Sequence, residues 1–174
     1  MAAIGDSITA GSPWDDDPEI GWPAAAAAAD TRLRFTVRAI YGKRTDEIAA
    51  WLDEAAAGAT ALVVQGGIND IAQGRPVDSA AANLLGMVRR GRKLGLRVAV
   101  ANVLPWNNGW PQAEAAIREL NALIQAMGVP VLPFHETLED PERPGRMRED
   151  WTIEGDHPSV EGYRRLGALA FRLP

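Results

Sequence analysis

The N-terminal stretch Met1-Ala-Ala-Ile-Gly-Asp-Ser-Ile-Thr-Ala-Gly11 decides how the rest of the chain is interpreted. A short apolar run, Ala2–Ile4, leads directly into Gly5-Asp6-Ser7, and this pattern predicts a buried strand that ends abruptly beside a serine. In open parallel α/β sheets, ligands bind at the carboxyl edge of the strands. Ser7 at such an edge is either a nucleophile or a helix N-cap, because Gly-Asp-Ser is also ordinary turn sequence.

Four further apolar runs also predict strands. They are rich in β-branched residues and bounded by turn residues, as expected of strands buried on both faces of a sheet. The runs are Phe35–Ile40, Ala61–Val64, Val98–Val103 and Val129–Leu132. Three segments have the 3.6-residue spacing of an amphipathic helix. Their apolar faces contain Val77, Ala81, Leu84, Val88 and Leu94; Ala113, Ile117, Leu120, Ile124 and Met127; and Val160, Tyr163, Leu166, Gly167 and Ala170.

Two shorter segments also favour helix. Ala24–Ala29 does so by propensity, and Thr45 is expected to be an N-cap, with Asp46 and Glu47 complementing the dipole of the first turn. Strand and helix therefore alternate about five times, which is typical of a parallel sheet with helices on both faces. We expect one domain over residues 1–174, a three-layer α/β/α sandwich of flavodoxin-like type with a parallel sheet of about five strands.

The composition excludes several classes of function. The chain has 174 residues, 47% of them hydrophobic, and no cysteine, so disulfides, thiol nucleophiles and thiolate metal sites are excluded. A formal charge of −5 argues against nucleic acid as a partner. No apolar run approaches the ~20 residues of a transmembrane helix, and no basic, apolar leader precedes the first strand. We expect a cytoplasmic protein without a transmembrane segment, although a leader trimmed from the native chain would also fit this start.

Four short stretches carry groups suited to catalysis. Three of them follow predicted strands and one precedes the last predicted helix, so we expect them to converge on the carboxyl edge of the sheet. The stretches are Gly5-Asp6-Ser7, Ile40-Tyr41-Gly42-Lys43-Arg44-Thr45, Gly66-Gly67-Ile68-Asn69-Asp70 and Glu154-Gly155-Asp156-His157-Pro158-Ser159.

Acyl transfer needs a nucleophile, a base and donors for an oxyanion. Ser7 can be the nucleophile, and His157 can be the base because imidazole titrates near neutral pH. Gly42 can offer a backbone N–H without a Cβ to block close approach, and Asn69 can donate from its side-chain amide. Each residue alone also has an ordinary structural explanation, as a turn, a loop or a cap. Together, in this order, they predict an acyl-transfer site.

The four stretches resemble the sequence blocks of the SGNH hydrolases, the GDSL-type esterases and lipases. Gly5-Asp6-Ser7-Ile8 is similar to the first block, Gly42 with its Gly-x-Arg-Thr-Asp context to the second, Gly67-x-Asn69-Asp70 to the third and His157-Pro158-Ser159 to the last. The resemblance implies Ser7 as nucleophile and an oxyanion hole formed by the backbone amides of Ser7 and Gly42 and the Asn69 side chain. It also implies hydrolysis of esters or thioesters without a cofactor.

The residue that orients His157 is where the chain departs from this family. The family has an aspartate three residues before the histidine, and this chain has Glu154 there. Glutamate keeps the charge and reaches about 1.5 Å further, as in Ser-His-Glu hydrolases. Asp156 is the rival, but adjacent side chains of an extended segment point to opposite sides. We expect Glu154 to orient His157, with Asp156 or a backbone carbonyl as the alternatives.

Three of the six tryptophans flank these loops. Trp14 follows the nucleophile stretch, and Trp106 and Trp110 flank Asn107-Asn108-Gly109 after the fourth strand. They either wall an acyl or sugar pocket or pack under the loops.

No metal site is expected. His135 has no second ligand at a suitable spacing, and Asp15-Asp16-Asp17 is interpreted as a solvated acidic loop.

The sequence thus predicts a serine esterase that acts on a small-molecule ester or acylated substrate. Two alternatives stay open. The same site could remove acetyl groups from a carbohydrate, or the chain could be a catalytically silent relative that binds an acyl or glycan ligand.

Overall fold

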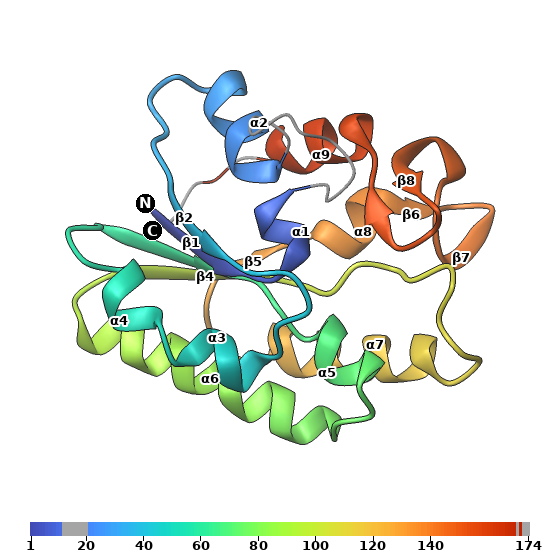
Figure 1. Cartoon of the computed structure of the whole chain (residues 1–174), viewed down its shortest axis with the longest axis horizontal. Coiled ribbons are helices and arrows are strands. Elements are labelled where there is room, and N and C mark those ends of the chain that lie inside the picture. The colour runs from blue at the N-terminus through green and yellow to red at the C-terminus, as the bar shows by residue number, and fades with distance from the viewer. Residues whose placement is uncertain (12–20, 170, 172–174) are drawn as a thin grey trace.

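The computed structural model describes residues 1–11, 21–169 and 171, and its centre is a parallel β-sheet (Figure 1). The strands lie in the order β2-β1-β3-β4-β5, and each neighbouring pair is parallel. They are β1 (Ala2–Gly5), β2 (Thr36–Ala39), β3 (Ala61–Val64), β4 (Arg97–Ala101) and β5 (Val131–Leu132). The predicted α/β fold with a five-stranded parallel sheet is therefore confirmed.

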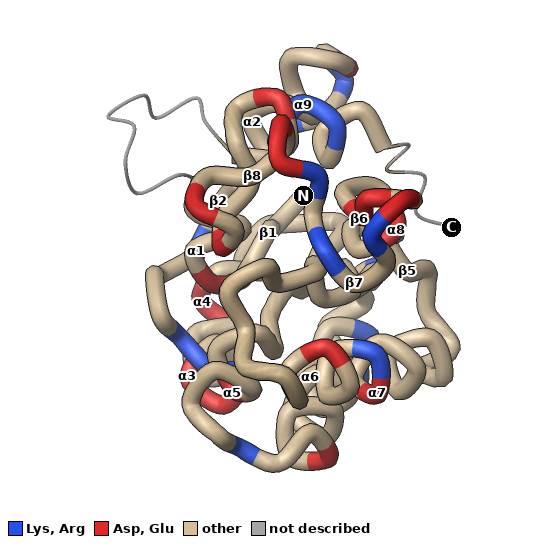
Figure 2. The backbone as a smooth tube through the Cα atoms, turned by 90° about the vertical axis from the view of Figure 1, so that its right-hand side faces the viewer, with Lys and Arg blue, Asp and Glu red and all other residues tan. Residues whose placement is uncertain are grey.

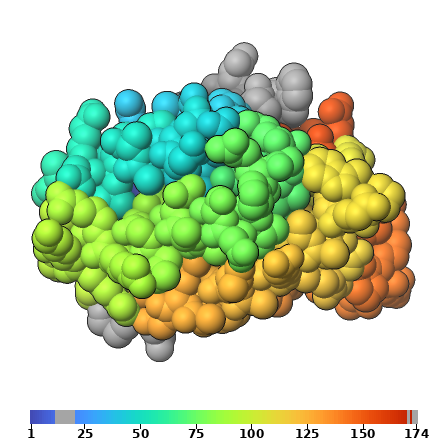
Figure 3. Space-filling view, turned by 90° about the horizontal axis from the view of Figure 1, so that it is seen from below, coloured from blue at the N-terminus to red at the C-terminus, as the bar shows by residue number. Residues whose placement is uncertain are grey.

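Helices cover both faces of this sheet, as Figure 1 shows. One face carries α3 (Thr45–Ala49), α4 (Leu52–Ala55), α5 (Ile68–Ala72), α6 (Val77–Lys93) and α7 (Ala113–Gln125), and Figure 3 views this layer from outside. The opposite face carries α1 (Ser7–Ala10), α2 (Trp22–Ala29), α8 (Phe134–Leu138) and α9 (Val160–Gly167).

Side chains that alternate along the strands divide the core in two. Ile4 and Val64 pack with the α3–α7 layer, whereas Ala3 and Val63 face the opposite layer. On that opposite face Trp22 is fully buried. Its ring lies against three phenylalanine rings, Phe35, Phe134 and Phe171, at centroid distances of 5.4, 5.5 and 5.2 Å.

The expectation of strands buried on both faces is wrong for β2. Its residues are mostly exposed, with Val37 at 45%, because β2 is the edge strand next to β1. Two residues predicted for apolar helix faces are also exposed: Leu94 caps the end of α6, and Val160 is the first residue of α9. Ala170 lies outside the described residues.

The prediction that Thr45 is an N-cap is also wrong. Arg44 occupies the cap position of α3, and its backbone N–H donates to the Glu47 carboxylate at 3.1 Å. Thr45 is the first helical residue, and its hydroxyl and backbone N–H donate to the two oxygens of Asp70 at 2.8 and 2.9 Å. This pair ties α3 to α5.

Two small antiparallel hairpins precede α9. The first pairs β6 (Glu139–Asp140) with β7 (Arg143–Met147), and a 3₁₀ turn, η1 (Glu149–Trp151), follows. The second pairs β8 (Thr152–Ile153) with β9 (His157–Pro158). The second hairpin carries the predicted base.

Oppositely charged residues lie near one another along the described chain. On the side that Figure 2 shows, Lys and Arg occur beside Asp and Glu. Two of the ion pairs of the described chain are Lys43–Glu47 and Arg90–Asp53. Within the described residues, no helix has both the length and the apolar character needed to cross a membrane.

Candidate active site

Ser7 lies at the junction of β1 and α1. The strand ends at Gly5, and Asp6 is the N-cap of α1, because its side chain accepts a hydrogen bond from the Ile8 N–H at 3.0 Å. Asp6 therefore has the capping role that was one explanation for Ser7. As the first helical residue, Ser7 has a backbone N–H with no partner within the helix.

His157 meets Ser7 across 150 residues of sequence. Its Nε2 lies 2.9 Å from Ser7 Oγ. The β8–β9 hairpin positions the ring, with Ile153 opposite His157 and the Thr152 hydroxyl donating to the His157 carbonyl oxygen at 2.8 Å. Burial lowers the pKa of His157 below its usual 6.5, and the negative charge of Asp156 partly offsets this effect. A neutral imidazole can accept the serine proton.

The two other predicted oxyanion donors come from the Gly42 turn and from α5, which contact each other. Gly42 has a φ of +73°, in the region that favours glycine, and its carbonyl oxygen accepts from Gln73 Nε2 at 3.0 Å. Asn69, in the first turn of α5, donates from Nδ2 to the Lys43 carbonyl oxygen at 3.2 Å. The Asn69 side chain also lies close enough to Asp6 to lower the pKa of that carboxyl group. Asn69 therefore links the Gly42 turn to the residue before Ser7.

The two candidates for orienting His157, Glu154 and Asp156, have different hydrogen-bond partners in the structure. The Glu154 side chain is exposed, its φ is +54°, and its carbonyl oxygen accepts from the Asn108 side chain. Among the residues described, no hydrogen bond joins the Glu154 carboxylate to His157. Asp156 Oδ1 instead accepts from Trp106 Nε1 at 2.7 Å. The choice between Glu154 and Asp156 stays a prediction.

The sequence model of the GDSL-like lipase/acylhydrolase family matches residues 3–165. The chain belongs to this family. The matched range includes all four motif stretches, from Ser7 to His157, and the resemblance drawn from them is confirmed. Membership of the GDSL family supports an esterase or acylhydrolase function.

Solved structures of GDSL-family proteins share the fold. A G-D-S-L family protein from Desulfitobacterium hafniense has a TM-score of 0.82 at 21% identity, covering 95% of this chain and 94% of that one. A GDSL-like lipase from Bacteroides thetaiotaomicron has a TM-score of 0.81 at 22% sequence identity, and the match covers 97% of this chain and 83% of that one. A variant of an acetyl xylan esterase from Geobacillus stearothermophilus has a TM-score of 0.72 at 16% sequence identity, and the match covers 95% of this chain and 89% of that one. A comparison with curated protein sequences gives no match.

Three polar residues near the GDSL serine were missed by the sequence analysis. Gln65, directly after β3, accepts from the Asp6 N–H at 3.2 Å and from the Thr9 hydroxyl at 2.8 Å. Asp6 itself is fully buried, and its Oδ2 has no hydrogen-bond partner among the described residues. Tyr163, assigned to a core face, also has a buried hydroxyl without such a partner. The sequence did contain a signal for Gln65, because a polar residue directly after a buried strand often lies at a functional edge of the sheet.

Burial has a strong effect on the Asp6 carboxyl group. It raises the pKa of Asp6 from 3.8 to about 6, against the opposing effect of hydrogen bonds from Ile8, Gln65 and Asn69. The negative charge of Asp70 acts in the same direction as burial. Burial also raises the pKa of the Tyr163 phenol, and the charge of Asp6 adds to that shift. Two buried polar groups, the Asp6 carboxyl and the Tyr163 hydroxyl, thus lie near Ser7 and close enough together for the charge of Asp6 to affect the pKa of Tyr163.

The predicted tryptophans are only partly described. Trp14 lies outside the described residues. Trp106 and Trp110 form an edge-to-face pair with ring centroids 5.3 Å apart, and Trp110 is 40% exposed. Since Trp106 also bonds Asp156, this aromatic pair stands beside the turn that carries the predicted base.

His135 lies in a structural environment away from the predicted site residues. It is buried, and its Nδ1 lies 2.9 Å from the Val103 carbonyl oxygen. Across residues 1–11, 21–169 and 171, no group of three or more His, Cys, Asp or Glu side chains is arranged to hold a metal ion.

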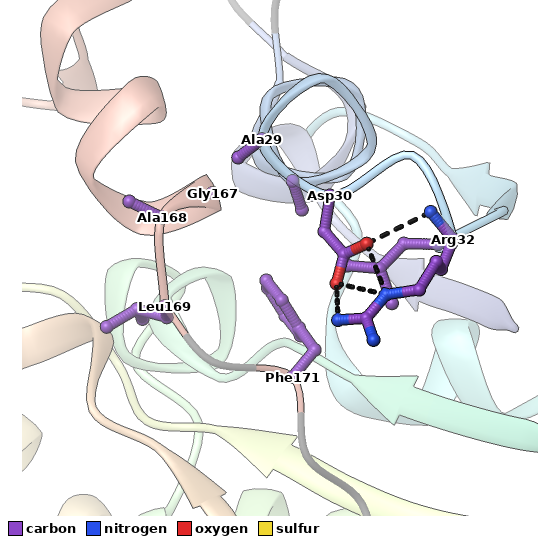
Figure 4. Close-up of a pocket in the computed structure, with 9 residues that line it drawn as sticks. Ala29, Asp30, Arg32, Gly167, Ala168, Leu169 and Phe171 are labelled. Atoms are coloured by element: carbon purple, nitrogen blue, oxygen red, sulfur yellow. Dashed lines mark hydrogen bonds and ion pairs between the residues drawn. The ribbon is translucent and has the colours of Figure 1, made fainter.

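A cavity of about 440 Å³ lies between the ends of α2 and α9 (Figure 4). Its lining contains none of the predicted site residues. The charged groups on its wall satisfy each other, because Arg32 donates to both oxygens of Asp30. This cavity is therefore not part of the candidate active site.

Proposed function

We propose that the chain is a serine esterase that hydrolyses small-molecule carboxylic esters or thioesters through an acyl-enzyme intermediate on Ser7. The observation that carries the proposal is the 2.9 Å distance between Ser7 Oγ and His157 Nε2. This distance lets a base take the proton of the nucleophile. Membership of a family of lipases and acylhydrolases supports the same chemistry.

In the first step, Ser7 Oγ attacks the ester carbonyl carbon while His157 Nε2 takes the serine proton. The N–H groups of Ser7 and Gly42 and the amide of Asn69 hold the oxyanion, and each such donor contributes roughly 3 kcal/mol. His157 then gives its proton to the departing alcohol or thiol. An acid on the turn before His157, Glu154 by the family's spacing or Asp156 by its contacts, stabilises the imidazolium.

In the second step, His157 takes a proton from water as the water oxygen attacks the acyl carbon. The tetrahedral species collapses, the acid product leaves, and Ser7 recovers its proton from His157. No step needs a metal or a cofactor.

The test is hydrolysis of p-nitrophenyl esters from acetate to palmitate by the wild type and by Ser7→Ala. We expect activity that peaks at one chain length and falls by at least about 10³-fold in Ser7→Ala. Ser79→Ala, an exposed serine on α6, is the matched control and retains activity. The rate should rise with pH through a pKa below 6.5, because burial lowers the pKa of His157.

Activity that survives in Ser7→Ala would reject the serine mechanism. A folded wild type without hydrolysis, but with binding of the same esters, would favour a silent acyl-binding or glycan-binding protein.

A carbohydrate O-acetylesterase is the second candidate. The aromatic pair of Trp106 and the exposed Trp110 beside the His157 turn is the observation that favours it, because tryptophan faces stack on sugar rings. The fold is also shared with an acetyl xylan esterase. Faster release of acetate from acetylated xylan than from p-nitrophenyl acetate, reduced in Trp110→Ala, would support this substrate class. Equal release by Trp110→Ala would count against it.

A further inference from the structure

The loop between β4 and α7 is hydrogen-bonded to the turn that carries His157. Trp106 Nε1 donates to Asp156 Oδ1 at 2.7 Å, and the Asn107 N–H donates to the Gly155 carbonyl oxygen at 2.9 Å. The Asn108 side chain donates to the Glu154 carbonyl oxygen. Three successive loop residues therefore bind three successive residues of the turn.

The same loop is also hydrogen-bonded to β7, through the Asn107 side chain. The Asn107 side chain accepts from the Met147 N–H at 2.7 Å and donates to the Met147 carbonyl oxygen at 3.0 Å. These bonds reproduce a strand-like pairing with the end of β7. The loop is thus hydrogen-bonded both to β7 and to the His157 turn, and the Trp106 indole donates to the carboxylate of Asp156.

Resting on the proposed function, we propose that Asp156, anchored by Trp106, is the positioning residue that supplies negative charge to His157 during acyl transfer. The family's spacing assigns this role to the residue at position 154. In this chain the side chains of Glu154 and Asp156 are both exposed. The carbonyl oxygen of Glu154 accepts a hydrogen bond from the Asn108 side chain, and the carboxylate of Asp156 accepts one from the Trp106 indole. The Asp156 carboxylate is held in place by its hydrogen bond from Trp106.

The direction of the electrostatic effect on the base agrees with this assignment. The charge of Asp156 raises the pKa of His157, against the larger lowering by burial. β9 also contacts α1 and α9. The other titratable groups on or beside these elements are Asp6, Glu154, Glu161, Tyr163, Arg164 and Arg165.

The test measures the pKa of His157 directly by NMR titration of imidazole signals. The chain has two histidines, and loss of one signal in His157→Asn assigns it. Asp156→Asn removes the charge but keeps an oxygen that accepts from Trp106. We expect the pKa of His157 to fall by about half to one pH unit in this variant. Glu154→Gln should leave it unchanged.

Trp106→Phe tests the anchor, because it retains an aromatic ring and removes the N–H donor. We expect a smaller fall in the His157 pKa, and none in Trp110→Phe, the neighbouring control ring. A fall in Glu154→Gln with no change in Asp156→Asn would overturn the proposal, as would no change in either. The titration needs no substrate, so it decides this inference even if ester hydrolysis is not found.

A kinetic measurement adds the catalytic consequence. At a pH above the His157 pKa in both proteins, Asp156→Asn should lower kcat up to about tenfold with little change in KM. A merely structural role would lower the melting temperature without moving the His157 pKa, and that outcome would also overturn the proposal.

Discussion

At the scale of single residues, the buried carboxyl group of Asp6 makes the fold sensitive to pH. Its folded-state pKa of about 6 lies above the ordinary 3.8, so the folded protein binds this proton more tightly than the unfolded chain. The contribution of Asp6 to stability is therefore most favourable at low pH and declines as pH rises from about 4 to about 6.

Asp6→Asn should remove this dependence. The amide oxygen still accepts from the Ile8 N–H, but no charge forms in the buried site. Relative to the wild type, the variant's free energy of unfolding should increase by about 2 kcal/mol between pH 4 and pH 7, since each pKa unit corresponds to about 1.4 kcal/mol and part of the change has already occurred at pH 4. Urea unfolding at a series of pH values measures the difference. Two parallel stability curves would contradict the prediction.

At the scale of elements, the His157 turn depends on Gly155. Its φ is +80°, and a Cβ there would lie 2.7 Å from Asn107 Cβ. Gly155→Ala should therefore lower the free energy of unfolding by more than the strain of a positive φ alone, by about 2–4 kcal/mol in total. It should also reduce ester hydrolysis, because the turn carries His157.

Gly128→Ala is the matched control for Gly155→Ala. Gly128 has a φ of +67°, but a Cβ there meets open space, so only the backbone strain of about 1 kcal/mol is expected. Thermal unfolding and ester hydrolysis are measured for both variants. Equal losses of stability would show that the contact with Asn107 contributes nothing.

The elements also show what sequence could predict. The strands β3 and β4 were found because each is an apolar run bounded by turn residues, and the short β1 was found because its apolar run leads directly into Gly5-Asp6-Ser7. The role of Thr45 was missed because its partner, Asp70, lies 25 residues away and no local pattern reveals it. The approach of His157 to Ser7 followed from family spacing and strand direction. The environment of Glu154 and Asp156 did not, because it depends on the loop around Trp106.

At the scale of the whole molecule, Trp22 connects one half of the core to the backbone beside Ser7. Its ring fills the centre of the α2–α9 face, and its Nε1 donates to the Thr9 hydroxyl at 3.2 Å, which in turn donates to Gln65. Gln65 accepts from the Asp6 N–H, next to Ser7. Packing and site geometry are therefore connected through hydrogen bonds.

Trp22→Phe should lower the free energy of unfolding by about 1–3 kcal/mol, because it removes this hydrogen bond and leaves space among the aromatic rings. Trp110→Phe, at a partly exposed position, should change it by less than about 0.5 kcal/mol. Denaturant midpoints with unchanged slopes measure both effects. A neutral Trp22→Phe would mean that the aromatic cluster tolerates the smaller ring.

The 150 residues between Ser7 and His157 also set an order in time. The ribosome releases Ser7 well before His157, and at about 5–20 residues per second the interval is roughly 8–30 s. Throughout that interval the growing chain carries an ordinary alcohol, unable to accept acyl groups efficiently from cellular esters. Under the proposed function, translation order thus delays the onset of this reactivity until His157 has been synthesised, and a chain that terminates before His157 stays inert.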